Sequence, residues 1–148
     1  MSHSIYLRRI FRPRQLKKTV NKVGKKIAEL KECGMKIDSV AFSGNSGAGI
    51  AYPLSFKTGI PLICVRKGER SHGSKVESVN AEIESYIIVD DCIASGRTVN
   101  HILDDIEFWV SEKIKCVGII LYDDDCENIR WANPGNIPIF RIPTRGEK

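Results

Sequence analysis

The chain has 148 residues, of which 42% are hydrophobic and 28% charged, enough for one sizeable core but not for two, so we expect a single domain over residues 1–148. No apolar run approaches the ~20 residues of a membrane-spanning helix, and residues 1–18 lack the apolar centre of a secretion signal, which argues for a soluble protein with no membrane partner. Five cysteines without a C-x-x-C pair indicate free thiols in a reducing compartment, and hence a cytoplasmic location.

Strands and helices alternate along the chain. Spacings of four and three predict a first helix from near Pro13 to near Gly34, with an apolar stripe at Leu16, Val20, Val23, Ile27 and Leu30. Helical spacing also predicts helices over 50–57 and 99–111. Apolar runs predict strands around Ile87 and over 37–42, 62–65, 116–122 and 137–142. This alternation is typical of an α/β fold with a mostly parallel sheet and helices on both faces.

The first predicted helix lies in a strongly basic part of the chain. Residues 1–36 hold 11 of the 23 Lys and Arg residues but only two of the 18 acids. One interpretation is a nucleic-acid-binding face; the other is a solvated helix that complements the protein's own acidic body or a partner subunit. The solvated face is favoured, because no aromatic residues for stacking on bases alternate with Lys17, Lys18, Lys22, Lys25 and Lys26.

The most informative stretch is 86–98, where an apolar run ends in two acids and a short turn opens an amphipathic helix. Asp90 and Asp91 close the strand, and the turn consists of Ala94, Ser95, Gly96, Arg97 and Thr98. Backbone N–H groups at a helix N-terminus form an anion site. Acids beside it repel phosphate but suit hydroxyl groups or a Mg²⁺ ion that accompanies the ligand. The pattern therefore predicts a phosphorylated sugar, with its phosphate in the turn and its diol on the acids.

This stretch resembles the signature of the type I phosphoribosyltransferases: hydrophobic residues, an acidic pair, two hydrophobic residues, then Ala/Thr-Ser/Thr-Gly-Gly/Arg-Thr. Every position fits, with Cys92 as a mild variant at a hydrophobic position. The resemblance implies a Rossmann-like fold, 5-phosphoribosyl pyrophosphate as substrate and Mg²⁺ as cofactor. It also implies that Asp90 and Asp91 engage the ribose hydroxyls, directly or through Mg²⁺, and that residues 94–98 wrap the 5-phosphate. The short chain leaves material for only a minimal hood over the base.

A second candidate site is the glycine-rich segment 44–49, which is predicted to be a loop after the first strand. Its three glycines permit positive φ angles and a close approach of the backbone to an oxyanion. By its place before the signature, the segment resembles the family's pyrophosphate-binding loop, which implies roles for Asn45, Ser46 and Gly47.

The basic segment 66–73 follows a predicted strand, and its order Arg-Lys-x-x-basic-x-His-Gly resembles the mobile catalytic loop of the orotate phosphoribosyltransferases. The resemblance implies that Arg66 and Lys67 hold the pyrophosphate while Arg70 and His72 close over it. That loop carries a lysine where this chain has Arg70. Because an arginine does not give up its proton as a lysine can, Arg70 is interpreted as a charge stabiliser and His72 as the group that titrates near neutrality. The alternative is an ordinary basic surface loop.

Candidates for contact with a nucleobase are Tyr122, Asp123 and Trp131. Family members bind the base under a variable hood, commonly with an aromatic residue stacked on the ring, which implies this role for Trp131 or Tyr122. The alternative is that Trp131 packs the C-terminal segment onto the body, because pocket and core aromatics look alike in sequence. Orotate enzymes place an arginine near this point, whereas this chain has acids that would repel orotate. A purine is therefore favoured.

Together these features predict a Mg²⁺-dependent phosphoribosyltransferase of nucleotide metabolism, an enzyme that joins a nucleobase to phosphoribosyl pyrophosphate or runs the reverse. We expect a homodimer. Two alternatives stay open. One is a non-catalytic regulator on the same fold, which senses phosphoribosyl pyrophosphate or nucleotides and binds nucleic acid through the basic helix. The other is a different phosphosugar enzyme, such as a pyrophosphate-forming ligase without a base site.

Overall fold

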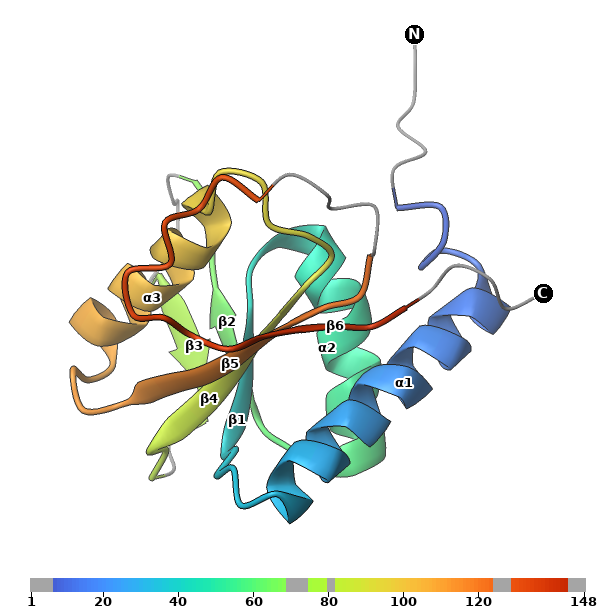
Figure 1. Ribbon diagram of the computed structural model, residues 1–148, viewed down its shortest axis with the longest axis horizontal. Helices are drawn as coiled ribbons and strands as arrows, with labels where there is room; N and C mark the ends of the chain where they lie inside the picture. Colours follow the sequence, from blue (N-terminus) through green and yellow to red (C-terminus); the bar gives the residue numbers. More distant parts are fainter. Residues whose placement is uncertain (1–6, 69–74, 80–81, 124–128, 144–148) are drawn as a thin grey trace, which may run out of the picture.

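The computed structural model describes residues 7–68, 75–79, 82–123 and 129–143 (Figure 1). A six-stranded sheet with the order β3-β2-β1-β4-β5-β6 forms its centre. The strands are β1 (Ser39–Phe42), β2 (Leu62–Val65), β3 (Val76–Ser78), β4 (Ser85–Asp90), β5 (Lys115–Leu121) and β6 (Ile139–Arg141). Neighbouring strands are parallel except at one edge, where β3 runs antiparallel to β2. The predicted mostly parallel sheet is confirmed, although β3 was not predicted.

Helices cover both faces of the sheet, as predicted. They are α1 (Pro13–Glu32), α2 (Gly44–Thr58) and α3 (Arg97–Trp109). On one face, Ile27 of α1 and Leu54 of α2 share a core with Ile87 of β4. On the other face, Ile102 of α3 packs in a core that includes Ile88 of β4. Successive strand residues point to opposite faces, so β4 must be apolar throughout to be buried on both sides.

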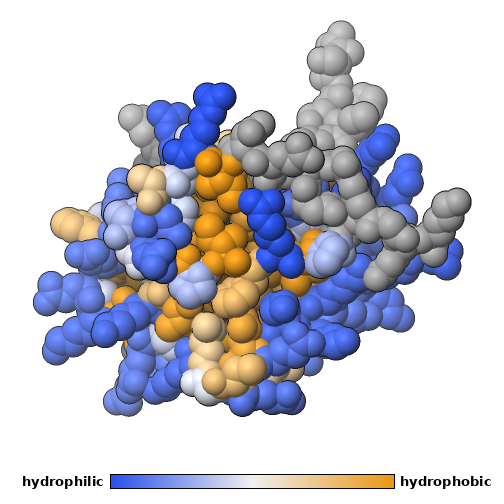
Figure 2. All heavy atoms as spheres, viewed as in Figure 1, coloured by the Kyte–Doolittle hydropathy of each residue, from blue (hydrophilic) through white to orange (hydrophobic). Residues whose placement is uncertain are grey.

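Helix α1 has one buried stripe and one charged face. Val20, Val23 and Ile27 are buried, as the predicted stripe requires, whereas Lys17 and Lys25 are exposed. Figure 2 shows hydrophilic residues over α1 on the right of the view and hydrophobic residues in the middle, where Figure 1 draws β5 and β6. None of the helices among the described residues combines the length and the apolar character of a membrane span.

The segment 44–49 is not the predicted loop. Gly44, at φ +74°, begins α2, and residues 45–49 form the first turns of that helix. A Cβ atom at Gly47 would lie 2.8 Å from the Cβ atom of Phe42 and 3.2 Å from the carbonyl oxygen of Val89. The absence of a side chain at Gly47 therefore lets α2 approach the sheet closely. A glycine-rich pattern that predicted a loop serves helix–sheet packing instead.

The cysteines are only partly as predicted. Cys33, Cys64 and Cys116 are free thiols. The prediction is wrong for Cys92, which is disulfide-bonded. Sequence spacing gave no signal for this bond, because a disulfide can join residues that are far apart in the chain.

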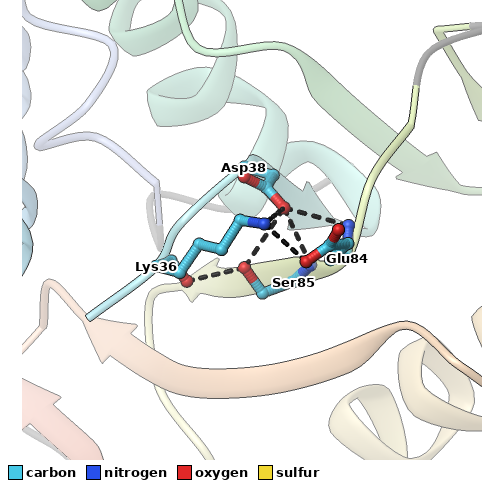
Figure 3. A network of polar contacts seen from close by, with 4 residues as sticks. All are labelled: Lys36, Asp38, Glu84 and Ser85. Atoms are coloured by element: carbon cyan, nitrogen blue, oxygen red, sulfur yellow. Dashed lines mark hydrogen bonds and ion pairs between the residues drawn. The ribbon is translucent and has the colours of Figure 1, made fainter. Parts of the chain in front are cut away.

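At the amino ends of β1 and β4, Asp38 ties the two strands together (Figure 3). Its carboxylate accepts hydrogen bonds from the backbone N–H groups of Glu84 (2.9 Å) and Ser85 (3.1 Å) and from the Ser85 hydroxyl (3.4 Å). The Lys36 ammonium lies 2.5 Å from Glu84 and 4.0 Å from Asp38. Burial raises the pKa of Asp38, but these hydrogen bonds and the charge of Lys36 outweigh it and hold the pKa below its ordinary value.

Asp38→Ala is expected to lower the free energy of unfolding by about 1–3 kcal/mol, because two backbone N–H groups lose their acceptor. Since the pKa of Asp38 is lowered in the folded state, its contribution is present above the unfolded pKa of about 4 and is lost as the pH falls below it. Urea unfolding should separate wild type from the variant at neutral pH and separate them less near about pH 3. The exposed Asp104→Ala on α3 is the matched control. Equal stabilities for wild type and Asp38→Ala would contradict this role.

Candidate functional site

A pocket of about 240 Å³ lies where β1, β2 and β4 end. Its lining consists of Ser46 near the start of α2, Lys67 just after β2, and residues 90–99, which run from the end of β4 into α3. The carboxyl ends of parallel strands share one edge of a sheet, and the helices that follow begin at that edge. The pocket therefore has the N-termini of α2 and α3 in its wall.

The turn at the start of α3 has the backbone of an anion site. Gly96, at φ +82°, is the N-cap residue, and no side chain caps the helix. The first bond of the helix runs from the N–H group of Asn100 to the carbonyl of Gly96 at 2.8 Å. The N–H groups of the first turn precede this bond and have no carbonyl partner within the helix. The first turn contains no acidic residue, so its partial positive charge is free to attract an anion.

The acid pair lies beside this turn and is almost fully buried. Asp90 is 4% exposed and Asp91 7%. One Asp90 oxygen accepts hydrogen bonds from the Ser46 hydroxyl and from the N–H group of Asp91, both at 2.9 Å. Burial, together with the hydrogen bond and the negative charge of Asp91, raises the pKa of Asp90 to about 7, and the two donors only partly offset this. Asp90 is thus protonated more readily than an ordinary aspartate.

The start of α2 forms the other end of the pocket. A Cβ atom at Gly44 would lie 2.9 Å from the ammonium nitrogen of Lys67, so this ammonium group rests against the helix N-terminus. Ser46 lines the pocket, while Asn45 is exposed and Gly47 is buried against the sheet. A cation and a helix N-terminus together suit a second anionic group.

Arg66 does not line the pocket with Lys67. Its guanidinium donates a hydrogen bond to Glu77 on β3 at 2.5 Å, and its carbonyl oxygen lies 2.9 Å from the ring nitrogen Nε2 of His101 on α3. Neighbouring residues of an extended chain point in opposite directions, which separates Arg66 from Lys67. Arg66, predicted to hold pyrophosphate beside Lys67, is thus engaged by β3 instead.

Two of the three residues that were predicted to contact a nucleobase make other contacts instead. Tyr122 is 6% exposed, and its hydroxyl donates to the carbonyl of Ser46 at 2.7 Å. Trp131 is buried in the core below α3 and packs against Gly96, so it does not present its ring to the pocket as the base-stacking prediction required. Asp123 stays near the site, because its N–H group donates to the carbonyl of Asp91 at 2.9 Å. Its carboxylate lies 3.6 Å from the guanidinium of Arg9.

The predicted site residues other than Asn45, Gly47 and Asp123, whose positions are given above, divide into three groups. Those that the structure brings into one pocket are Ser46, Lys67, Asp90, Asp91, Ala94, Ser95, Gly96, Arg97 and Thr98. Arg66, Tyr122 and Trp131 point elsewhere, and Arg70 and His72 lie outside the described residues. Within the described ranges, no three His, Cys, Asp or Glu side chains form a metal cluster. Pocket residues that the sequence reasoning did not assign to the site are Cys92, Ile93 and Val99, of which the last two have the apolar character of any core residue.

No protein-family model matches the sequence, and no curated protein matches it. Solved structures do match. UMP synthase from Leishmania donovani superposes with a TM-score of 0.66 at 18% identity over 89% of this chain and 27% of that chain. Orotate phosphoribosyltransferase from Mycobacterium tuberculosis H37Rv gives 0.66 at 16% identity, covering 91% and 76%. Adenine phosphoribosyltransferase from Saccharomyces cerevisiae gives 0.63 at 19% identity, covering 90% and 81%.

This chain spans about a quarter of the UMP synthase chain but most of each of the other two. The likeness extends over the whole sheet and its helices rather than over one motif, because it covers about nine tenths of this chain. The chain therefore has the fold of the type I phosphoribosyltransferases, as the signature at 86–98 predicted.

Proposed function

We propose that this protein is a phosphoribosyltransferase that joins a nucleobase to 5-phosphoribosyl pyrophosphate and releases pyrophosphate. The observation that carries this proposal is the order of groups in one pocket: the start of α3, then the acid pair, then the start of α2 with Lys67. The substrate has the same order of groups, with a phosphate at one end, a ribose diol in the middle and a pyrophosphate at the other end. A single ligand can thus satisfy all three parts of the pocket.

The roles of the residues follow from this placement. Residues 94–98 bind the 5-phosphate through backbone N–H groups. Asp90 and Asp91 accept hydrogen bonds from the ribose hydroxyls. Lys67 and the first turn of α2, which contains Asn45, Ser46 and Gly47, bind the pyrophosphate. We retain Arg70 and His72 as catalytic candidates on the strength of their resemblance alone.

Transfer at the anomeric carbon passes through an oxocarbenium-like state, as in glycoside hydrolysis. The protein therefore has two tasks, which are to position the base against the sugar and to stabilise the negative charge of the departing pyrophosphate. Lys67 serves the second task. Two adjacent buried carboxyl groups suit Mg²⁺, which is commonly held by one or two carboxylates together with substrate phosphates. When bound, Mg²⁺ supplies charge neutralisation at the pyrophosphate, and Asp90 and Asp91 are the residues that would hold it.

We propose a purine as the base. One of the acids that argued against orotate, Asp123, lies near the site, since its N–H group donates to the carbonyl of Asp91. Its ion pair with Arg9 weakens that argument, because the arginine reduces the repulsion of an anionic base. The Arg9 guanidinium and the Asp123 carboxylate also place a hydrogen-bond donor beside an acceptor, as the edge of a purine requires.

The decisive experiment is a screen of adenine, guanine, hypoxanthine, xanthine, uracil and orotate with phosphoribosyl pyrophosphate and Mg²⁺, read as pyrophosphate release. We expect release with at least one purine. Orotate as the sole substrate would overturn the purine proposal but leave the transferase standing. Binding of phosphoribosyl pyrophosphate without turnover on any base, together with a shifted nucleic-acid probe, would establish the regulator instead.

The affinity for ribose 5-phosphate is expected to rise as the pH increases through about 7, because only ionised Asp90 is a charged acceptor for the ribose hydroxyls. The ligand's own phosphate titrates near pH 6, so the measure is the difference between wild type and Asp90→Asn in calorimetric titrations from about pH 6 to about pH 8. Since folding raises the pKa of Asp90, its effect on stability has the opposite sign. That stabilisation is full below the unfolded pKa of about 4 and is lost as the pH rises to about 7. Parallel pH profiles for the two proteins would contradict this assignment.

We also propose that the protein acts as a homodimer in the cytoplasm. Large apolar side chains remain exposed on the single chain, notably Phe56 (96%) and Phe108 (79%), and exposed apolar surface commonly marks an interface. Light scattering after gel filtration measures the oligomeric state directly.

The free thiols of Cys33, Cys64 and Cys116 support a reducing compartment, whereas the disulfide at Cys92 does not.

A further inference from the structure

The chain segment that precedes β6 packs against the back of the phosphate turn. The N–H group of Arg130 donates to the carbonyl of Ala94 at 2.8 Å. The indole N–H of Trp131 donates to the side-chain oxygen of Asn100, in the first turns of α3, at 2.9 Å. The indole ring itself lies against the α-carbon of Gly96, where even a methyl group would overlap it. Arg130 and Trp131 thus contact this part of the chain at Ala94, at Gly96 with its positive φ, and at Asn100.

The turn has little to hold it in shape from within. The side-chain hydrogen bond within the turn, from the N–H group of Arg97 to the Ser95 hydroxyl, is long at 3.4 Å, and no side chain caps α3. Trp131, in contrast, is 8% exposed and belongs to the core cluster of α3 and the sheet. The directions of the N–H groups therefore depend on a buried residue from a distant part of the chain.

We propose that Trp131 is a positioning residue for the 5-phosphate, one that keeps residues 94–98 in the shape that binds phosphate. Trp131 does not line the pocket. It acts through Gly96 and Asn100. Phosphate recognition by backbone N–H groups depends on their direction, so a turn that relaxes loses affinity although each of its residues is present. This inference rests on the proposed function, because it takes residues 94–98 as the phosphate site.

Two variants remove the support in different ways. Asn100→Ala takes away the acceptor of the indole N–H, and Trp131→Phe keeps a ring behind Gly96 without the N–H group. Each is expected to lower the affinity for ribose 5-phosphate about tenfold. This is the effect of losing about one hydrogen bond that holds the turn in the shape that binds phosphate. The affinity for pyrophosphate should stay unchanged, because that end of the pocket belongs to Lys67 and α2.

Two controls on the same helix complete the calorimetric experiment. Trp109→Phe alters an exposed tryptophan, and Ile106→Val weakens the buried side of α3 at a residue outside the pocket lining. Neither should change the affinity for ribose 5-phosphate. A merely structural role for Trp131 would instead lower both affinities together with the melting temperature, whereas Ile106→Val should lower the melting temperature alone.

Fluorescence gives an independent readout that needs no change at Trp131. The chain has two tryptophans, so Trp109→Phe leaves Trp131 as the sole one, and ribose 5-phosphate should change its emission saturably with the calorimetric affinity. Wild type that binds no ribose 5-phosphate would sink the proposed function. Wild type that binds it, while Asn100→Ala and Trp131→Phe bind it equally well and the emission stays constant, would overturn only this inference.

Discussion

Asp90→Asn combined with Asp91→Asn is expected to lower the affinity for phosphoribosyl pyrophosphate at least about a hundredfold while the protein stays folded. A hydrogen bond to a charged acceptor contributes roughly 1.5–3 kcal/mol, and the substitution replaces two charged acceptors by neutral amides of the same shape. The fold should tolerate this change. The amide oxygen at position 90 can still accept from the Ser46 hydroxyl and the N–H group of residue 91, and a buried carboxyl with a raised pKa is no longer present.

Calorimetric titration with phosphoribosyl pyrophosphate and Mg²⁺ measures this effect, and thermal unfolding checks the fold. Asp104→Asn, an exposed acid on α3, removes negative charge from the same part of the molecule and should leave the affinity unchanged. If the double variant bound as tightly as wild type, the acid pair would not contact the ribose. The proposed match between the groups of the pocket and those of the substrate would then fail.

The acid pair and the turn could be predicted because their information is local. A buried strand, two acids, a positive-φ glycine and a helix start follow one another within 13 residues. These residues identify the anion site, although the directions of its N–H groups also depend on Trp131. The apolar stripe of α1 could also be predicted, since Val20, Val23 and Ile27 repeat at helical spacing. Parallel strand order followed from the alternation of elements.

The remaining site residues depend on contacts that no local pattern records. Gly47 looked like part of a loop, but its position is set by the close approach of α2 to β1 and β4. Arg66 looked equivalent to Lys67, but its partner Glu77 lies on β3, a short polar edge strand that carries no apolar signal. The sequence left Trp131 with two interpretations, base stacking or packing, and only the fold shows that it packs behind Gly96. Side chains of the same type serve cores and pockets alike.

Gly96→Ala is expected to abolish measurable saturable binding of ribose 5-phosphate, a loss of at least about a hundredfold. Two costs coincide at this residue. Its φ of +82° costs an alanine about 1–2 kcal/mol, and the new Cβ atom would overlap the indole of Trp131, lying 2.7 Å from the Cβ atom of that residue. The methyl group therefore points at the tryptophan behind the turn. The turn must move to relieve the overlap, and its N–H groups then no longer converge on the phosphate.

Gly59→Ala separates these two costs. Gly59 has φ +74° at the end of α2, and a Cβ atom there would meet no other atom within 4 Å. It should lose about 1–2 kcal/mol of unfolding free energy through backbone strain alone and keep full affinity for ribose 5-phosphate. Gly96→Ala should lose about 1–3 kcal/mol more than this, the usual cost of overpacking, and lose the ligand as well. If the two alanine variants were equally stable and Gly96→Ala still bound ribose 5-phosphate normally, Trp131 would yield to the methyl group without moving the turn. If Gly96→Ala lost the expected stability and still bound ribose 5-phosphate normally, residues 94–98 would not be the phosphate site.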